Sequence, residues 1–324
     1  MSYLDELKSS SFFYAFLHFC DFILKKLQKV IDNVFLCGYY KGATNVKKKS
    51  QMLKGAFTMD WLGVEGKTVI VTGGSSGIGA AIVKELCELG INVVNADLRE
   101  GSFTHEKLFF SQTDVTSPES VEQTVEAAVA KYQSIDAVVN NAGINIPALL
   151  VDEKMTEDGK FQINEQIFNK MIAINQKGVY LMGQAVGRVM VEQGYGVIIN
   201  MSSECGLEGS EGQSVYAATK AAVNSFTRSW AKELGKKGVR VVGIAPGIME
   251  ETGLRTIEYE TALAYTRGIS VEQLRAGYTN TKTIPLGRDG KLREVADLVA
   301  YFISNRSSYV DGVTVNVAGG KTRG

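Results

Sequence analysis

A tyrosine and a lysine four positions apart, Tyr216 and Lys220 in the stretch SVYAATK, have the types and spacing for acid–base chemistry. Residues four apart lie on one face of an α-helix, so the lysine charge could act on the phenol oxygen. Two interpretations follow. Either the helix carries a half-buried tyrosine and a solvated lysine, or the ammonium lowers the pKa of the phenol and makes Tyr216 an acid and base near neutral pH.

A strand, a glycine-rich turn and a helix are predicted in TVIVTGGSSGIGAAIVKELCELG, which begins at Thr68. The spacing of the glycines lets the backbone turn tightly and lets a pyrophosphate approach the N-terminus of the helix. A glycine pattern alone is weak and can mark an ordinary loop, but here the flanking strand and helix are the required context. The predicted phosphate-binding residues are Gly73, Ser75, Ser76, Gly77, Ile78 and Gly79.

A second predicted strand, INVVNA, ends at Asp97, about 20 residues after the glycine turn. A carboxylate at that position can bind a ribose 2′-hydroxyl and repels a 2′-phosphate, so NAD(H) is favoured over NADP(H). Arg99 lies close to Asp97 in the sequence and argues against this preference, because its guanidinium could bind the 2′-phosphate of NADP(H).

Strand and helix signals alternate along the rest of the chain, which predicts an α/β fold with right-handed βαβ units and a doubly wound, Rossmann-like parallel sheet of about seven strands. Ligands bind at the carboxyl ends of the strands in such a fold. Asp114, Asn140–Gly143, Ser203 and Pro246–Gly247 each follow a predicted strand, so we expect them to converge on one cleft. Taken singly, each is also a residue type that commonly ends a loop.

The composition limits the partners. Lys+Arg and Asp+Glu are equal at 35 each, so no charge excess argues for nucleic acid. The two histidines, His18 and His105, lack neighbours at ligand spacing, and no metal site is predicted. The four cysteines are scattered, which favours a reducing cytoplasm; they are Cys20, Cys37, Cys87 and Cys205.

Residues 1–58 differ in composition from the remainder, which we expect to be a single catalytic domain over 59–324. The apolar run SFFYAFLHFC falls short of the about 20 residues that span a bilayer. Three interpretations stand: an interfacial amphipathic helix, a helix that docks on the core or a partner, or translation of DNA upstream of a start at Met59. Codons for Lys54–Ala56 can form a purine-rich ribosome-binding sequence, which favours the third. Membrane contact is expected only under the first.

Over residues 66–320, the ordered set TGGSSGIG, DV, NNAG, a strand ending in SS, YAATK and PG resembles the short-chain dehydrogenase/reductase family. The resemblance implies an NAD-dependent oxidoreductase in which Tyr216 is the catalytic acid and base and Lys220 its partner, which also holds the nicotinamide ribose. It implies that Ser203, rather than Ser202, orients the substrate oxygen and that Asn175 fixes a water in a proton relay. Further cofactor contacts are implied for Asp97, Asp114, Val115, Asn141, Ala142, Gly143, Pro246 and Gly247.

Two long segments depart from a minimal member of the family: residues 144–168, and an insert over about 248–290 where a lid would lie. They resemble family members that act on a polyol phosphate, which implies a sugar phosphate substrate. A phosphate needs cationic donors. The insert supplies Arg255 and Arg267 as first choices, besides Arg275, Lys282 and Arg288. Glu204 and Glu208 could bind polyol hydroxyls or cap a loop.

Two other functions stay open at this point. The chain could reduce another polyol or a 3-oxoacyl carbonyl, although the polar lid and Asp97 speak against acyl reduction. It could also be a redox-sensing protein that binds NAD without turnover, although a binder does not need Asn175, Ser203, Tyr216 and Lys220 together. The resemblance implies a homo-oligomer, either a dimer or a tetramer, formed through the long helices that carry Asn175 and Tyr216.

Overall fold

The computed structural model describes residues 61–154, 159–253 and 255–321. The segment Leu62–Gly324 forms one compact unit. The predictions for residues 1–58 lie outside the described residues. Within the described part of the chain, no helix is both long enough and apolar enough to cross a membrane.

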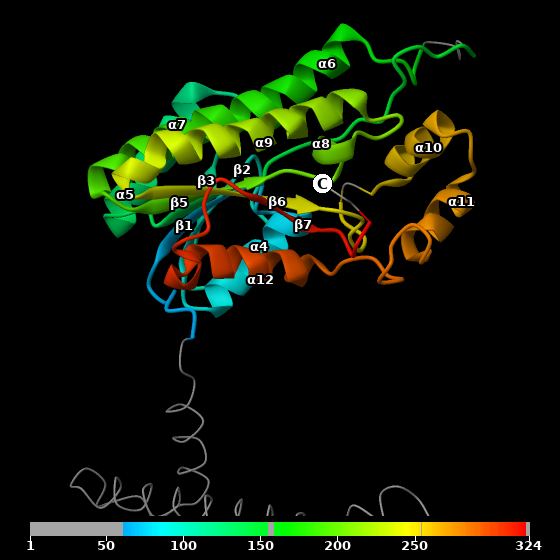
Figure 1. Cartoon of the computed structure of the whole chain (residues 1–324). Coiled ribbons are helices and arrows are strands. Elements are labelled where there is room, and N and C mark those ends of the chain that lie inside the picture. The colour runs from blue at the N-terminus through cyan, green and yellow to red at the C-terminus, as the bar shows by residue number, and fades with distance from the viewer. Residues whose placement is uncertain (1–60, 155–158, 254, 322–324) are drawn as a thin grey trace, which may run out of the picture. The chain divides into compact units, whose positions relative to one another are not determined.

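A parallel sheet of seven strands forms the centre of the unit, as predicted, with the order β3-β2-β1-β4-β5-β6-β7 (Figure 1). The order reverses direction between β1 and β4, and this point opens a crevice at the carboxyl ends of the strands. The strands are β1 (Thr68–Thr72), β2 (Asn92–Asp97), β3 (Leu108–Gln112), β4 (Ala137–Asn140), β5 (Gly196–Met201), β6 (Val239–Pro246) and β7 (Thr314–Val317).

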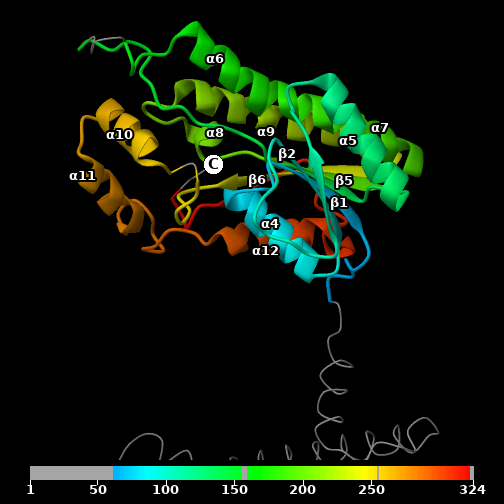
Figure 2. The same cartoon turned by 180° about the vertical axis from the view of Figure 1, so that it is seen from behind.

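Helices cover both faces of the sheet. One face carries α4 (Gly77–Glu88) and α12 (Leu292–Ile303), and the other carries α5 (Pro118–Tyr132), α7 (Gly178–Gln193) and α9 (Ser214–Leu234); Figure 2 shows the same layers from behind. The strands alternate accordingly. Val69 and Val71 pack in the apolar cluster under α4 and α12, whereas Ile70 packs under α5, α7 and α9. Because both faces are covered, β1 is buried along its whole length.

The long helix predicted over residues 164–192 has an irregular centre. It consists of α6 (Glu165–Ile172), a π-helical turn η1 (Ala173–Lys177) and α7. Asn164 caps it, because its side chain accepts a hydrogen bond from the amide of Ile167 at 2.8 Å. A π turn carries an additional residue in the helix, which periodicity in the sequence does not reveal.

The second long insert forms a small helical lid made of α10 (Ile257–Thr266), α11 (Val271–Ala276) and the short helix η3 (Gly277–Thr279), seen beside the carboxyl ends of the strands in both views (Figures 1 and 2). The lid has an apolar cluster of its own, in which Leu263, Ala264 and Leu274 are buried. The remaining short helices are α8 (Cys205–Glu208), η2 (Gly235–Lys237) and η4 (Asn305–Ser307).

The two inserts that the sequence singled out lie against each other. The Tyr265 hydroxyl of α10 donates to the Asp152 carboxylate at 2.9 Å, and the Tyr265 ring stacks on Phe161 with centroids 4.1 Å apart. Gly212 lies between them and the core: its φ is +74°, and a Cβ there would be 2.1 Å from Thr266 Oγ1. The lid therefore docks on the catalytic side of the sheet through close packing and hydrogen bonds.

Candidate active site

The glycine turn between β1 and α4 has the shape that a dinucleotide pyrophosphate requires. Gly73 and Gly77 adopt φ values of +65° and +55°, and a Cβ at Gly79 would lie 2.0 Å from the Gly73 carbonyl oxygen. Ser76 is the N-cap of α4 but makes no side-chain capping bond, so the first amides of the helix face the cleft. Positive helix ends with open amides bind phosphate groups well.

Asp97 lies at the carboxyl end of β2, beside this turn. Its Oδ2 accepts a hydrogen bond from the Ser75 amide at 3.0 Å, and its Oδ1 accepts one from the Arg99 amide at 3.4 Å. The Ser75 hydroxyl donates to the Arg99 carbonyl at 2.5 Å, so Ser75 supports Asp97 and does not itself line the cleft. The glycine turn can hold the pyrophosphate, and the Asp97 carboxylate follows it at the spacing typical of residues that bind the ribose 2′-hydroxyl. Together they fit a dinucleotide without a 2′-phosphate.

The NNAG segment after β4 is fastened to the glycine turn. The Asn141 side chain donates to the carbonyls of Thr72 and Gly73 at 3.0 and 3.1 Å, and the Thr72 hydroxyl accepts from the amides of Asn141 and Ala142. Asn141 therefore acts on the cofactor cleft chiefly by fixing its wall. The amide group of Asn141 supplies both donors, which a glycine or a proline at this turn would lack.

The predicted catalytic tyrosine and serine meet at the far side of the same cleft. Tyr216 is half-buried on α9, Ser203 is 8% exposed at the end of β5, and a side-chain hydrogen bond links the two. Burial raises the pKa of Tyr216, and the hydrogen bond with Ser203 opposes that shift. Ser202 is turned away, because its hydroxyl donates to the Lys220 carbonyl at 3.2 Å. The choice of Ser203 over Ser202 therefore agrees with their placement.

Lys220 follows Tyr216 by one turn of α9, and its side chain reaches toward the end of β5. Its ammonium is 5.8 Å from the centre of the Tyr216 ring and donates to the Met201 carbonyl at 2.7 Å. The side chain is 4% exposed, and burial lowers the pKa of Lys220 to about 8. Desolvation raises the pKa of Tyr216 in the protein without its cofactor, so the prediction that Lys220 and oxidised nicotinamide together lower this pKa stays a prediction.

Asn175 occupies the π-helical turn η1 and is fully buried. Its Oδ1 accepts from the Ile144 amide and its Nδ2 donates to the Ile144 carbonyl, both at 2.8 Å, and Nδ2 also donates to Thr219 Oγ1 at 3.2 Å. A Cβ on Gly143 would be 3.4 Å from Asn175 Oδ1 and 3.6 Å from Lys220 Nζ. Asn175 therefore lies beside Lys220, and its side chain holds the backbone after the NNAG segment; its water-binding role stays a prediction.

One cleft of about 1150 Å³ joins these groups. Most predicted site residues line it: Gly73, Ser76, Gly77, Ile78, Gly79, Asp97, Asp114, Val115, Asn141, Ala142, Gly143, Ser203, Glu204, Tyr216, Lys220, Pro246, Gly247, Arg255 and Arg267. Ser75 and Asn175 lie behind its wall. Within the described residues, no group of three His, Cys, Asp or Glu side chains could hold a metal ion.

The lid cations separate into two groups. Arg275 binds the buried Glu260 carboxylate at 2.5 Å and Arg288 binds Glu294 at 2.6 Å, and neither lines the cleft. Arg255 and Arg267 do line it. Arg255 stacks over the Tyr278 ring at 4.1 Å and donates to the Met249 carbonyl. Arg267 donates to Ser210 Oγ at 3.1 Å. Among the described residues, no carboxylate forms an ion pair with Arg255 or Arg267.

Lys321 is a cleft residue that the sequence reasoning missed. Its ammonium is 2.6 Å from Glu204 Oε1 and 3.7 Å from Glu208. The pair joins the chain after β7 to the residue next to Ser203, and the Glu204 side chain is 7% exposed. No short-range signal links residues that are 117 positions apart, so this contact could not be predicted from spacing.

Comparison with known proteins agrees with this geometry. A family model described as short chain dehydrogenase matches residues 67–263. The chain belongs to the short-chain dehydrogenase family. The resemblance drawn from the motifs is thereby confirmed.

Individual members of the short-chain dehydrogenase family are also similar to the chain. Sorbitol-6-phosphate 2-dehydrogenase from Klebsiella pneumoniae is 60% identical over 266 residues, which cover 82% of this chain and 99% of that protein. The 3-oxoacyl-[acyl-carrier-protein] reductase FabG from Thermotoga maritima is 34% identical over a match that covers 79% of this chain and 98% of that protein. A crystal structure of 3-ketoacyl-(acyl-carrier-protein) reductase from Brucella melitensis complexed with NADH superposes with a TM-score of 0.67 at 27% identity. The superposition covers 80% of this chain and 99% of that one.

Proposed function

We propose that the protein is an NAD-dependent dehydrogenase that interconverts D-sorbitol 6-phosphate and D-fructose 6-phosphate. The observation that carries the proposal is one cleft that combines the glycine turn, the Ser203–Tyr216–Lys220 group and two lid arginines without carboxylate partners among the described residues. The 60% identity to a sorbitol-6-phosphate 2-dehydrogenase supports the choice of substrate. The NADH complex of the similar reductase supports the choice of cofactor.

The glycine turn, the N-terminus of α4 and Asp97 would hold NAD, which accepts or donates the hydride when bound. Tyr216 removes the proton of the substrate hydroxyl as the hydride leaves the carbon, and returns it in the reverse direction. Ser203 donates a hydrogen bond to the substrate oxygen and orients it. Lys220 supplies positive charge beneath Tyr216, which favours the phenolate as the proton leaves.

Arg255 and Arg267 are proposed to bind the substrate phosphate. Replacing Arg267 with Ala should lower kcat/KM for sorbitol 6-phosphate by about tenfold or more, since a charge-assisted hydrogen bond contributes roughly 1.5–3 kcal/mol. Activity on sorbitol itself should change little. The matched control is Lys282→Ala, an exposed lid cation that does not line the cleft. Equal losses on both substrates would argue against phosphate contact at Arg267.

A direct assay tests the function itself. Mixing the protein with NAD and D-sorbitol 6-phosphate should produce the absorbance of reduced nicotinamide, and Tyr216→Phe should abolish it while leaving NAD affinity nearly unchanged. If wild-type protein binds NAD but gives no signal with any polyol phosphate, the redox-sensing alternative gains support. Turnover of a 3-oxoacyl thioester would instead favour a 3-oxoacyl reductase, the activity named for the FabG proteins to which the chain is also similar.

The same proposal includes the setting of the enzyme. We place it in the cytoplasm, since Cys87 and Cys205 are free thiols and a sugar phosphate is a cytoplasmic metabolite class. We also propose a homo-oligomer that associates through the outer faces of α7 and α9. No nucleic acid partner is proposed.

A further inference from the structure

The inner side of the lid places a phenol beside two amide groups of the core. The Tyr259 hydroxyl on α10 receives hydrogen bonds from Gln213 Nε2 at 2.9 Å and from Asn145 Nδ2 at 3.4 Å. Gln213 directly precedes α9, and Asn145 follows the NNAG segment. All three residues line the cleft.

The two amide contacts decide where the phenol hydrogen can point. An amide nitrogen only donates, so the Tyr259 oxygen is the acceptor in both bonds and its own hydrogen must be directed elsewhere. The orientation of Gln213 is fixed from its other end, because Gln213 Oε1 accepts from Cys205 Sγ at 3.5 Å. Burial raises the pKa of Tyr259 to about 12, so the phenol keeps this hydrogen at neutral pH.

Asn145 provides the complementary group. Its Oδ1 is buried and has no hydrogen-bond partner among the described residues. Leaving a buried acceptor unpaired is unfavourable, so such an atom in a ligand cleft indicates a donor that arrives with the ligand. Tyr259 and Asn145 thus offer one free donor and one free acceptor, joined by their mutual hydrogen bond.

These two groups lie next to the reacting centre. Tyr259 is close enough to Tyr216 to act on it electrostatically. Asn145 follows Ile144, the residue whose backbone Asn175 holds. The pair therefore faces the part of the cleft that the carbon chain of a substrate occupies when its reacting hydroxyl is at Ser203 and Tyr216.

We propose that Tyr259 and Asn145 form a subsite for one hydroxyl of the substrate other than the reacting one. The Tyr259 hydroxyl donates to the oxygen of that substrate hydroxyl, which in turn donates to Asn145 Oδ1. This inference rests on the proposed function and deepens it. A methylene in the same position would leave both protein atoms unpaired, so the subsite selects polyols and rejects acyl chains.

Ketose phosphates that each lack one hydroxyl test the subsite. One of them should lose about tenfold or more in kcat/KM with the wild-type protein, relative to fructose 6-phosphate. With Tyr259→Phe, the loss on that same analogue should shrink to about threefold or less, because the variant no longer reads the hydroxyl. Asn145→Ala should reduce the penalty for the same analogue, and it carries the test if Tyr259→Phe does not fold.

The control is Tyr265→Phe, which removes a hydroxyl from the same helix where it bonds Asp152 and does not line the cleft. It should keep the wild-type pattern across the analogues, even if lid docking weakens. An unchanged pattern in both Tyr259→Phe and Asn145→Ala would overturn the subsite and leave the proposed function standing. A wild-type protein that reduces no ketose phosphate would instead overturn the proposed function.

Discussion

Single residues of the candidate site were predictable where the chemistry depends on neighbours along the chain. Tyr216 and Lys220 share a helix face because they are four residues apart. Gly73 and Gly77 of the turn are predictable because their positive φ angles favour glycine over other residues. Their surroundings were not predictable. The ammonium of Lys220 donates to Met201 on β5, and desolvation decides the direction of its pKa shift. Neither the contact nor the burial follows from the spacing of two residues.

Lys220→Met should change how stability depends on pH. Burial lowers the pKa of Lys220 from 10.5 to about 8, so the unfolded chain binds the additional proton between these values. The free energy of unfolding then rises with pH across this window, and below pH 8 the cost of burying the ammonium is fully present. Relative to Lys220→Met, wild-type protein should gain on the order of 2 kcal/mol from pH 8 toward 10.5 in denaturant titrations.

The same variant should also lose turnover and bind NAD more weakly, because two tasks are assigned to this lysine. Parallel pH profiles of unfolding for the two proteins would contradict the charge burial. Normal NAD affinity in Lys220→Met would contradict the second task.

Asp97→Asn should relax the preference for NAD. The change removes the negative charge that repels a 2′-phosphate, and it retains an oxygen that can accept from the Ser75 amide. The ratio of kcat/KM for NAD to that for NADP should fall by about tenfold or more, which corresponds to ~1.4 kcal/mol. If the wild-type protein already uses both cofactors equally, the role of Asp97 is wrong.

At the scale of elements, the strands and long helices followed from periodicity, and the contacts between distant inserts did not. The sequence singled out residues 144–168 and 248–290 as additions, yet only the structure shows that Tyr265 of one bonds Asp152 of the other. The π turn around Asn175 also escaped prediction, because it changes the register of a helix by one residue without a change in composition.

Gly212→Ala should weaken the docking of the lid. The added Cβ would approach Thr266 Oγ1 and Cβ at 2.1 and 2.5 Å, and neither atom is the end of a flexible side chain. Gly194→Ala is the control, since Gly194 is in the left-handed region with a similar φ of +79° and nothing lies within 4 Å of its added Cβ. Both variants share the strain of a left-handed alanine, about 1–2 kcal/mol.

The difference between the two glycine variants isolates the contact with α10. We expect Gly212→Ala to be about 1–3 kcal/mol less stable than Gly194→Ala in chemical denaturation, as is usual for overpacked sites. Equal stabilities would show that α10 can move away from Gly212 at no cost.

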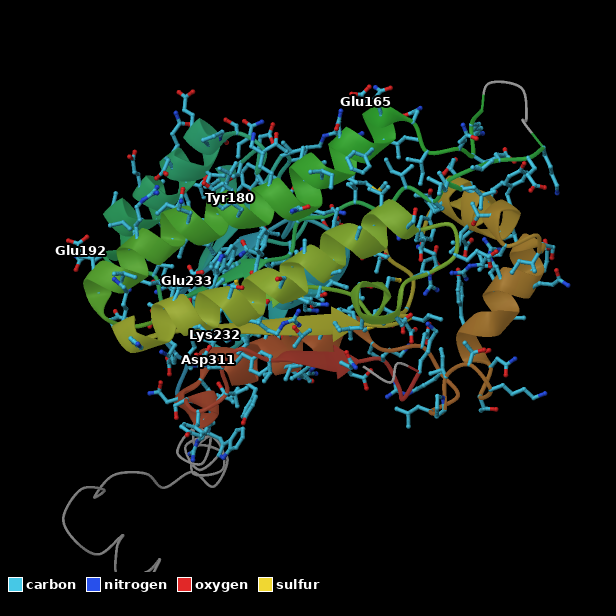
Figure 3. The ribbon with its side chains drawn as sticks, turned by 45° about the horizontal axis from the view of Figure 1, so that its top comes forward. Glu165, Tyr180, Glu192, Lys232, Glu233 and Asp311 are labelled. Atoms are coloured by element: carbon cyan, nitrogen blue, oxygen red, sulfur yellow. The ribbon has the colours of Figure 1, made fainter. Side chains whose placement is uncertain are left out.

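For the whole molecule, the parallel sheet and its two helical layers were predictable because strand, turn and helix signals alternate in one order. Assembly with other copies depends on surfaces that such signals do not describe. Figure 3 shows Tyr180 on α7 between Glu165 and Glu192, on the side away from the sheet. Tyr180 is 42% exposed, and Phe168 on α6 is 46% exposed. Large apolar side chains at this density on two successive helices favour an interface between copies.

Tyr180→Glu should therefore reduce the oligomer mass measured by light scattering after size exclusion, because a carboxylate would be buried without a partner at the interface. The control is Tyr309→Glu, at a fully exposed tyrosine between η4 and β7. A wild-type protein that elutes as a single chain would contradict the proposed oligomer. An unchanged oligomer in Tyr180→Glu would remove the outer face of α7 from the interface.

The separate apolar cluster of the lid, around Leu263, Ala264 and Leu274, has a consequence for protein engineering. Because these side chains form a cluster separate from the two that flank the sheet, substitutions at the cleft-facing side of the lid should leave the packing around the sheet intact. Variants for new polyols should first be sought in a library at Tyr259 on α10 and at Arg267, the C-cap of this helix, with the sheet unchanged.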